Sequence, residues 1–305
     1  MSNVIETTDL MKRFRSTWAV DGLSLGVPEG SIYALLGPNG AGKTTTIKTV
    51  MNMYRPSAGS TRLLGVDSRR IGPTELRQVG YVSENQELPT WMSVGRLLAF
   101  CRPLYPTWDE GFSERLMNFF KLQPHLKVGE LSRGMRMKAA LLVSLSYRPR
   151  LLVMDEPFTG LDALVRDELI RGVLELSEDG GWTVLISSHD IDEVERLADR
   201  VAIIDAGRCR LEEPVGNLQA RFRRMELVVT DRTTVPDRPP PEWLVVERAG
   251  TRLTFVHSDY SAEATPEELT RHLGVWQSDE ATRMSLKEIF LALARTYDLH
   301  EGGRS

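Results

Sequence analysis

Two acidic residues stand side by side where an apolar run of the sequence ends. Leu151–Met154 is wholly apolar, Asp155 and Glu156 follow it, and Pro157 then closes the segment. Such a run is typical of a strand that is buried on both faces of a sheet. Because carboxylates at the end of a buried strand are costly to desolvate, we expect a positive group to meet them.

A glycine-rich loop earlier in the sequence indicates what this positive group is. The sequence LLGPNGAGKTTT follows the apolar run Ile32–Leu36, and its glycines, Lys43 and Thr44 have the full spacing of a phosphate-binding loop. Glycines let successive N–H groups turn toward an anion, and the start of the next helix adds partial positive charge. We expect Lys43 to reach the β- and γ-phosphates and Thr44 to offer its hydroxyl to Mg²⁺. The predicted nucleotide-binding residues of the loop are Gly37, Pro38, Asn39, Gly40, Ala41, Gly42, Lys43, Thr44 and Thr45. The alternative is a glycine-rich turn without a ligand.

The loop suggests different tasks for the two carboxylates. Mg²⁺ carried in with ATP is the expected positive group, and Asp155 suits its coordination, through a water molecule. Successive residues of a strand point to opposite sides, so Glu156 is available to orient and polarise an attacking water. Such a base typically contributes about 10² to 10⁴ in rate. The alternative is that both acids only cap a strand or pair with an arginine.

Short apolar strands alternate with helix-length segments between Ser31 and Asp205. This alternation predicts an α/β domain with a mostly parallel sheet covered by helices on both faces. Between Ser93 and Tyr147 helical patterns dominate, which predicts a helical subdomain at about residues 85–148. The expected strands are IYALLGP, QVGYVS, LLVMD, WTVLISS and RVAIID, and the expected helices are Lys43–Tyr54, Asp109–Leu122, Ser132–Tyr147, Ala163–Ser177 and Ile191–Ala198.

The character of the sequence changes after Asn217. A proline-rich connector, PDRPPPEW, precedes a predicted hairpin that turns at Ala249–Gly250. Two capping boxes then predict helices, Thr265 with Glu268 and Ser285 with Glu288. We therefore expect an ATP-binding domain at residues 1–220 and a small α+β domain at residues 221–305.

Composition excludes several classes of protein. The 305 residues carry a net charge of −4 with a pI near 5.9, which gives no case for a nucleic-acid partner. No run approaches the roughly 20 apolar residues of a membrane span, and the start of the chain lacks the apolar core of a signal peptide. The five histidines show no HxxxH pair, and the two cysteines lie far apart. We expect a cytoplasmic protein that reaches a membrane only through a partner.

Three further motifs, in this order, complete a family pattern. They are LSRGM at Leu131–Met135, TGLD at Thr159–Asp162, and His189 within SSHD. With the phosphate-binding loop and the MDEP strand end, they make the chain resemble the nucleotide-binding subunit of ABC transporters over about residues 4 to 220. The resemblance implies a P-loop NTPase of the ABC type, which hydrolyses ATP with Mg²⁺.

The resemblance also assigns roles to residues that are otherwise uninformative. It implies that Ser132 and Gly134 contact the γ-phosphate of an ATP held by the opposite subunit, so that two ATP molecules lie in a head-to-tail dimer. His189 is expected to hold the γ-phosphate and the attacking water, and Asp162 to lie at the dimer seam. Phe14 stands where the family places an aromatic residue on adenine, although Trp18 competes for this role and core packing is an alternative for Phe14.

Two residues depart from the family pattern. Glu84 stands where the family usually carries a glutamine, and Gln86 follows two residues later. We expect Glu84 to do the work of that glutamine at the Mg²⁺ ion, with altered metal dependence. Met135 replaces the glutamine that commonly follows the signature glycine, which affects contacts near the nucleotide of the partner.

The leading hypothesis is an ATPase subunit that drives a separate integral membrane permease. The chain is expected to pair with itself or with a related subunit, on the inner face of the cell membrane, and its C-terminal domain is similar to that of bacterial export-type subunits. Leu88–Trp108, rich in aromatic and apolar residues, is the candidate docking surface for the permease, and the alternative is that this segment is ordinary core. The alternatives are an ABC-type ATPase acting on ribosomes or nucleic acid, and a P-loop kinase, which leaves LSRGM, TGLD and His189 without a shared purpose.

Overall fold

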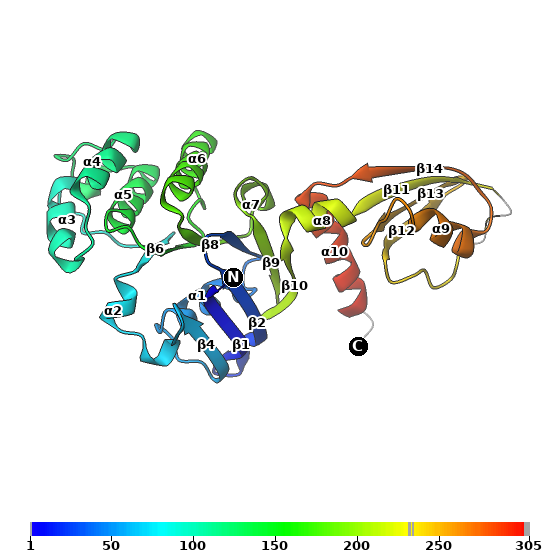
Figure 1. Ribbon diagram of the computed structural model, residues 1–305, viewed down its shortest axis with the longest axis horizontal. Helices are drawn as coiled ribbons and strands as arrows, with labels where there is room; N and C mark the ends of the chain where they lie inside the picture. The colour runs from blue at the N-terminus through cyan, green and yellow to red at the C-terminus, as the bar shows by residue number, and fades with distance from the viewer. Residues whose placement is uncertain (1, 231–232, 234, 302–305) are drawn as a thin grey trace. The chain divides into compact units, whose positions relative to one another are not determined.

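Two compact units make up the chain in the computed structural model, which describes residues 2–230, 233 and 235–301. The first unit is Met1–Glu212 and the second is Glu213–Ser305. Figure 1 shows the helices and strands of both along the chain. The first unit has two sheets and the second has one, and each unit has its own hydrophobic core, so each is described by itself.

A six-stranded sheet forms the centre of the first unit, in the order β10-β9-β3-β8-β7-β6. The pairs of β3 with β8 and β9, and of β7 with β6 and β8, are parallel, which confirms the predicted parallel sheet. Every residue of β3 and β7 is buried, as expected of strands covered on both faces. The strands are β3 (Ile32–Leu36), β6 (Val79–Ser83), β7 (Leu151–Asp155), β8 (Thr183–Ser188), β9 (Arg200–Asp205) and β10 (Arg208–Pro214).

Helices lie between these strands, as the sequence predicts. The main ones are α1 (Lys43–Val50), α5 (Arg133–Leu145), α6 (Ala163–Gly180) and α7 (Ile191–Leu197). α3 (Val94–Cys101) and α4 (Glu110–Phe119) gather beside α5 at one end of the unit (Figure 1), within the range expected for a helical subdomain. A short α2 (Pro73–Leu76) precedes β6.

A second sheet in the same unit was not predicted. It is antiparallel, with the order β2-β1-β4-β5, and contains β1 (Asn3–Phe14), β2 (Thr17–Pro28), β4 (Ala58–Leu63) and β5 (Val66–Asp67). Its apolar side chains share one core with the parallel sheet, because Ile5, Leu23 and Val27 belong to the same buried cluster as Leu35 and Val153. The N-terminal strands are therefore packed against the strands that carry the loop residues.

The second unit is a four-stranded antiparallel sheet with helices. The order is β12-β13-β11-β14, and the predicted hairpin is confirmed by the pairing of β12 with β13. Its core is formed by apolar side chains of the sheet and of one helix, α9 (Thr265–Leu273): Met225, Leu227, Leu253, Phe255, Leu269 and Leu273. The elements are α8 (Val215–Arg221), β11 (Arg223–Val229), β12 (Trp243–Ala249), β13 (Arg252–His257), α9 (Thr265–Leu273), β14 (Trp276–Arg283) and α10 (Leu286–Glu301).

One of the two predicted capping boxes forms. Ser285 N donates to Glu288 Oε2 at 2.9 Å and Glu288 N donates to Ser285 Oγ at 3.2 Å, at the start of α10. The box at Thr265 is wrong, because α9 already begins at Thr265, so that this residue lies within the helix rather than before it. Glu268 instead accepts a hydrogen bond from Trp243 Nε1 at 2.6 Å.

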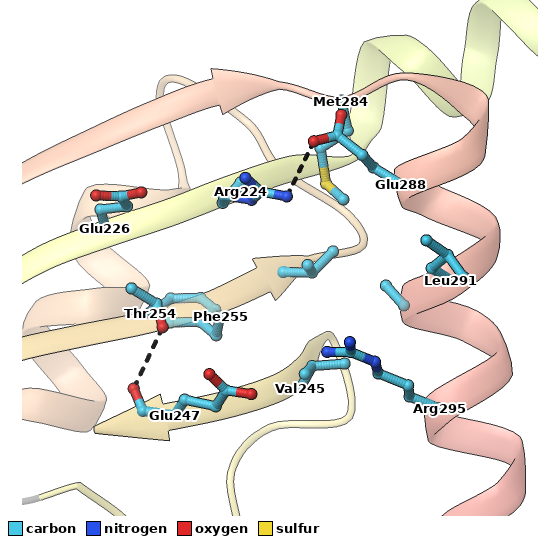
Figure 2. A pocket seen from close by; sticks show the side chains of 12 residues that line it. Arg224, Glu226, Val245, Glu247, Thr254, Phe255, Met284, Glu288, Leu291 and Arg295 are labelled. Atoms are coloured by element: carbon cyan, nitrogen blue, oxygen red, sulfur yellow. Dashed lines mark hydrogen bonds and ion pairs between the residues drawn. The ribbon is translucent and has the colours of Figure 1, made fainter. Parts of the chain in front are cut away.

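A hollow of about 340 Å³ lies between the sheet and α10, as Figure 2 shows. Arg224 and Glu226 of β11 point into it, because their neighbours Met225 and Leu227 point to the core on the other face. Arg224 Nη2 donates to Glu288 Oε1 at 2.9 Å, which ties the sheet to α10. Contact between α10 and this face is therefore partly polar.

Candidate active site

The loop from Gly37 to Gly42 leaves β3 and enters α1 with backbone conformations that need glycine. Gly40 has φ +85° and Gly42 has φ +103°, a region that side chains disfavour. A Cβ atom at Gly42 would also overlap the carbonyl oxygen of Ala19, and one at Gly37 would overlap that of Ile204. Pro38, Asn39 and Gly40 are exposed, whereas Ala41 and Gly42 are buried and Thr45 is half-buried. The backbone thus takes the glycine-dependent conformation in which N–H groups can turn toward an anion such as phosphate.

Lys43 is buried beside this loop, with 5% of its side chain exposed. Its Nζ donates to the carbonyl oxygens of Gly37 at 2.7 Å and Pro38 at 3.2 Å. The same nitrogen lies 3.0 Å from Glu156 Oε1. The ammonium group is therefore held at the mouth of the loop, with one carboxylate as its charged partner.

Thr44 and Asp155 meet at the corner between α1 and β7. Thr44 Oγ1 donates to Asp155 Oδ1 at 2.9 Å, and Ser187 Oγ donates to the same oxygen at 2.7 Å. Hydroxyl and carboxylate oxygens are the hard donors that Mg²⁺ prefers, so this set fits the ion. No group of three or more His, Cys, Asp or Glu side chains among the described residues is arranged to hold a metal alone. The donor set therefore fits a metal that brings further ligands with it, such as phosphate oxygens.

Ser187 was missed by the sequence analysis. It is the penultimate residue of β8 and lies directly opposite Asp155 in the parallel register, and its Oγ also accepts from Glu156 N at 3.0 Å. It thus fixes both carboxylate residues at once. The signal that could have found it is its place near the end of a predicted strand that neighbours LLVMD.

Glu156 has a left-handed backbone conformation, with φ +52°, directly after β7. This turn points its side chain toward His189, whose Nδ1 lies 2.7 Å from Glu156 Oε2, and toward Thr159, whose Oγ1 donates to the same oxygen at 3.2 Å. Because an ionised carboxylate can only accept, Nδ1 of His189 carries the proton and Nε2 points away for another partner.

The charge on Glu156 is stabilised by its neighbours. Burial alone would raise the pKa of this carboxyl, but hydrogen bonds from Lys43 and His189 outweigh it, and the pKa of Glu156 is lowered. At neutral pH the residue is therefore ionised, which is the state that a general base needs.

The signature residues lie at the start of α5. Ser132 is the N-cap, its Oγ accepting from Met135 N at 3.2 Å. A Cβ at Gly134 would lie 2.6 Å from Val165 Cγ1, so this glycine lets α5 approach α6 closely. Asp162 caps α6 by accepting from Val165 N at 2.9 Å. No hydrogen bond or ion pair in the described part of the chain joins Ser132 or Gly134 to the phosphate-binding loop of the same chain.

Two exposed aromatic residues lie on the hairpin of β1 and β2. Phe14 is 42% exposed and Trp18 is 41% exposed. The Phe14 and Tyr54 rings are nearly perpendicular with centroids 5.2 Å apart, and Lys12 Nζ lies 4.9 Å from the Phe14 centroid. Core packing thus does not bury Phe14. The close approach of Gly42 to Ala19, next to Trp18, places this hairpin beside the phosphate-binding loop.

Glu84 is predicted to act at the metal site, but its side chain is hydrogen-bonded elsewhere. Its Oε1 accepts from Arg133 Nη2 at 2.7 Å, whereas only its backbone reaches the metal corner, with Glu84 N donating to Asp155 O at 3.0 Å. The structure thus brings together Lys43, Thr44, Asp155, Glu156 and His189, and leaves the side chain of Glu84 at the start of α5.

None of the helices in the described ranges is both long and apolar enough to cross a membrane.

The chain is similar to several known proteins. The sequence profile of the ABC transporter family matches residues 20–159. The chain is 32% identical over 235 residues to the bacitracin transport ATP-binding protein BcrA of Bacillus licheniformis, a match that covers 76% of this chain and 77% of the relative. It is 34% identical to the daunorubicin/doxorubicin resistance ATP-binding protein DrrA of Streptomyces peucetius, over 72% of this chain and 68% of the relative.

The relatives also include proteins named for uptake. The sulfate/thiosulfate import ATP-binding protein CysA of Xanthomonas campestris is 36% identical over 67% of this chain and 62% of the relative. Among solved structures, the ATP-binding subunit of an ABC transporter aligns with a TM-score of 0.64 and 27% identity, covering 71% of this chain and 92% of that one. The predicted P-loop ATPase fold is confirmed.

Proposed function

Because this chain belongs to the ATP-binding proteins of ABC transporters and hydrolyses ATP, we propose that it works as one half of a dimer that drives a separate membrane permease. In this proposal two ATP molecules lie between two subunits, each of which offers its phosphate-binding loop to one ATP and its Ser132 and Gly134 to the other. The observation that supports it most is the convergence of Lys43, Glu156 and His189 at the mouth of the loop.

The proposed chemistry is attack of a water molecule on the γ-phosphorus of ATP, which breaks the bond to the β,γ-bridging oxygen and releases ADP and phosphate. Glu156 orients this water and accepts its proton, while Nε2 of His189 binds the γ-phosphate or the water. Lys43 and the loop N–H groups bind the β- and γ-phosphates and stabilise the charge that develops on them. Thr44 and Asp155 hold Mg²⁺, which neutralises phosphate charge when it is bound.

Lys43 controls the strength of Glu156 as a base in this scheme. Its ammonium is one of the two groups that lower the pKa of Glu156. When the Lys43 ammonium pairs with a phosphate instead, the Glu156 carboxylate loses part of that stabilisation, and its affinity for a proton rises. Glu156 is then a better base with ATP in place than without it.

Phe14 is the proposed platform for adenine. It is exposed, its ring is fixed by Tyr54, and its hairpin borders the phosphate-binding loop. Asp162, at the start of α6 and joined to the α5 terminus through Val165, is proposed to lie at the seam between the two subunits.

The permease is proposed to dock on the helical subdomain. Within Leu88–Trp108, Trp91 is 68% exposed, Phe100 58% and Leu104 50%, which is unusual for such large apolar side chains in one short segment. Docking there would hold the protein at the inner face of the cell membrane. The double variant Trp91→Ser/Phe100→Ser should still bind ATP once purified. It should no longer co-purify with the permease from membranes.

Export is the proposed direction. The matches to BcrA and DrrA cover 76% and 72% of 305 residues, more than the 212 residues of the first unit, so both include part of the second unit. The match to the import protein covers 67%, and so does the match to the Nod factor export ATP-binding protein I of Burkholderia lata, so the support for export comes from the two relatives whose match reaches the second unit. Loss of an exporter should sensitise cells to toxic compounds, whereas loss of an importer should create a nutrient requirement.

The experiment that tests the whole proposal is purification of a tagged Glu156→Gln protein from membranes in the presence of ATP. A multi-span membrane protein in a fixed ratio to this chain supports the proposal. Co-purification with ribosomes or nucleic acid instead would support the alternative, an ABC-type ATPase outside transport.

A further inference from the structure

Glu84 and Arg133 form an ion pair between two segments that the proposed function assigns to different nucleotides. Arg133 Nη2 lies 2.7 Å from Glu84 Oε1. Glu84 follows β6 beside the metal corner of its own subunit, and Arg133 directly follows Ser132 at the start of α5. Both side chains line a hollow of about 330 Å³ that also includes Gln86 and Arg136.

The backbone of Glu84 lies next to the proposed metal ligands even though its side chain does not. Ser83 is paired with Asp155 in the parallel register of β6 and β7, and Glu84 N donates to Asp155 O at 3.0 Å. Asp155 Oδ1 in turn accepts from Thr44. Rotation about the side-chain bonds of Glu84 can therefore exchange Arg133 for the metal corner without breaking a strand.

Electrostatics favours a different partner for Glu84 in each condition. Asp155 and Glu156 already place two carboxylates at the corner, and Lys43 is the ion-pair partner of Glu156, so a third carboxylate without a further cation is repelled, and Glu84 gains by pairing with Arg133. A divalent cation reverses this preference, because it binds several carboxylate oxygens at once. A glutamine at position 84 carries no charge, so both the repulsion by the two carboxylates and the attraction to the cation would be weaker.

Arg133 also covers the segment that precedes Asp162. A Cβ added to Gly160 would lie 2.6 Å from Arg133 Nη1, and Gly160 has φ +70°. The guanidinium thus lies over the TGLD turn while it holds Glu84. The Arg133 side chain, at the start of α5, therefore contacts both Glu84 and the TGLD turn.

We propose that Arg133 is a positioning residue that competes with Mg²⁺ for the carboxylate of Glu84. This inference rests on the proposed function. When Mg²⁺ binds with ATP, Glu84 leaves Arg133 for the metal corner, and the guanidinium remains beside Ser132 without its carboxylate. The pair is half-exposed, with 49% of the Arg133 side chain and 29% of the Glu84 side chain accessible, so it is weak enough to be exchanged.

The test is equilibrium binding of adenylyl imidodiphosphate, which is not hydrolysed, measured by calorimetry with EDTA and then across a Mg²⁺ titration. Arg133→Gln should lower the Mg²⁺ concentration at the midpoint by about twofold to fivefold, the range expected for an exposed ion pair. Arg133→Lys keeps the charge and should lie close to the unmodified protein. With EDTA all variants should bind the nucleotide equally.

Two controls make the result specific. In a Glu84→Gln background, Arg133→Gln should have no effect on the midpoint, because Arg133 acts only through the carboxylate. Arg69→Gln removes a comparable exposed pair, with Asp67, and should change nothing.

An unchanged midpoint in Arg133→Gln, or an equal shift in both backgrounds, would overturn the inference and leave the proposed function standing. Absence of nucleotide binding by the unmodified protein, with or without Mg²⁺, would instead remove the proposed function itself. Circular dichroism of each variant excludes unfolding as the cause.

Discussion

Lys43 Nζ lies 3.0 Å from Glu156 Oε1, so the cation suited to phosphate and the carboxylate suited to water are each other's partners. Both are largely buried, with 5% and 13% of their side chains exposed, so the pair is little screened by solvent. A phosphate that binds Lys43 must therefore share or replace Glu156. The arrangement couples arrival of the substrate to release of the base.

Lys43→Met should reduce ATP hydrolysis by about 100-fold or more, because it removes a charge that stabilises the phosphates while keeping most of the side-chain volume. The measurement is steady-state phosphate release at saturating ATP. Lys48→Met, in the last turn of the same helix, is the control and should retain activity. Equal activity of both variants would exclude Lys43 from the reaction.

Glu156 should contribute to stability in a pH-dependent way. Its pKa is lowered in the folded protein from the ordinary value of 4.5, so its contribution is fully present above that value and is lost as the pH falls through the folded pKa. Without nucleotide, Glu156→Gln should lower the melting temperature most at neutral pH, because it leaves Lys43 without its carboxylate. The difference from the unmodified protein should shrink below about pH 4.5. A difference that is constant with pH would contradict the ion pair.

Gly134→Ala should be destabilising, and Val165 should be the reason. The added Cβ would lie 2.6 Å from Val165 Cγ1, which forces α5 and α6 apart at a cost of about 1–3 kcal/mol. Val165→Ala opens this space, so the double variant should regain most of the loss in urea unfolding. Failure of Val165→Ala to compensate would show that Gly134 is needed for another reason.

The capping box of α10 gives a test in the second unit. Ser285→Ala removes the acceptor for Glu288 N and should cost about 0.5–2 kcal/mol of helix stability. Thr265→Ala is the matched comparison, since Thr265 lies inside α9 and does not cap it. Hydrogen exchange in α10 should rise for Ser285→Ala alone.

The sequence predicted the parts of the site that are formed by residues close together in the chain. The phosphate-binding loop, the strand end at Asp155 and the helix that begins near Ser132 each follow from residues adjacent in the chain. The buried strands of the parallel sheet were also predicted, because LLVMD and IYALL have no polar alternation. Each of these signals is complete within about ten residues.

The remaining parts depend on long-range pairing or on weak patterns. Ser187 reaches Asp155 only through the register of β7 and β8, and Arg133 reaches Glu84 across 49 positions. The register of β1 with β2 shifts several times along their length, so their sequences lack regular alternation. β14 is exposed over most of its length, which removes the apolar pattern that reveals a strand.

The most direct measurement is the molar mass of the Glu156→Gln protein with and without ATP and Mg²⁺, by light scattering during gel filtration. Slow hydrolysis should trap the closed state, so the molar mass should shift from 34.4 kDa to twice that value with ATP. Ser132→Arg in the same background should prevent the shift, since Ser132 is expected to face the ATP of the other subunit. A protein that binds ATP yet stays at the monomer mass, or that hydrolyses ATP at the unmodified rate, would contradict the account.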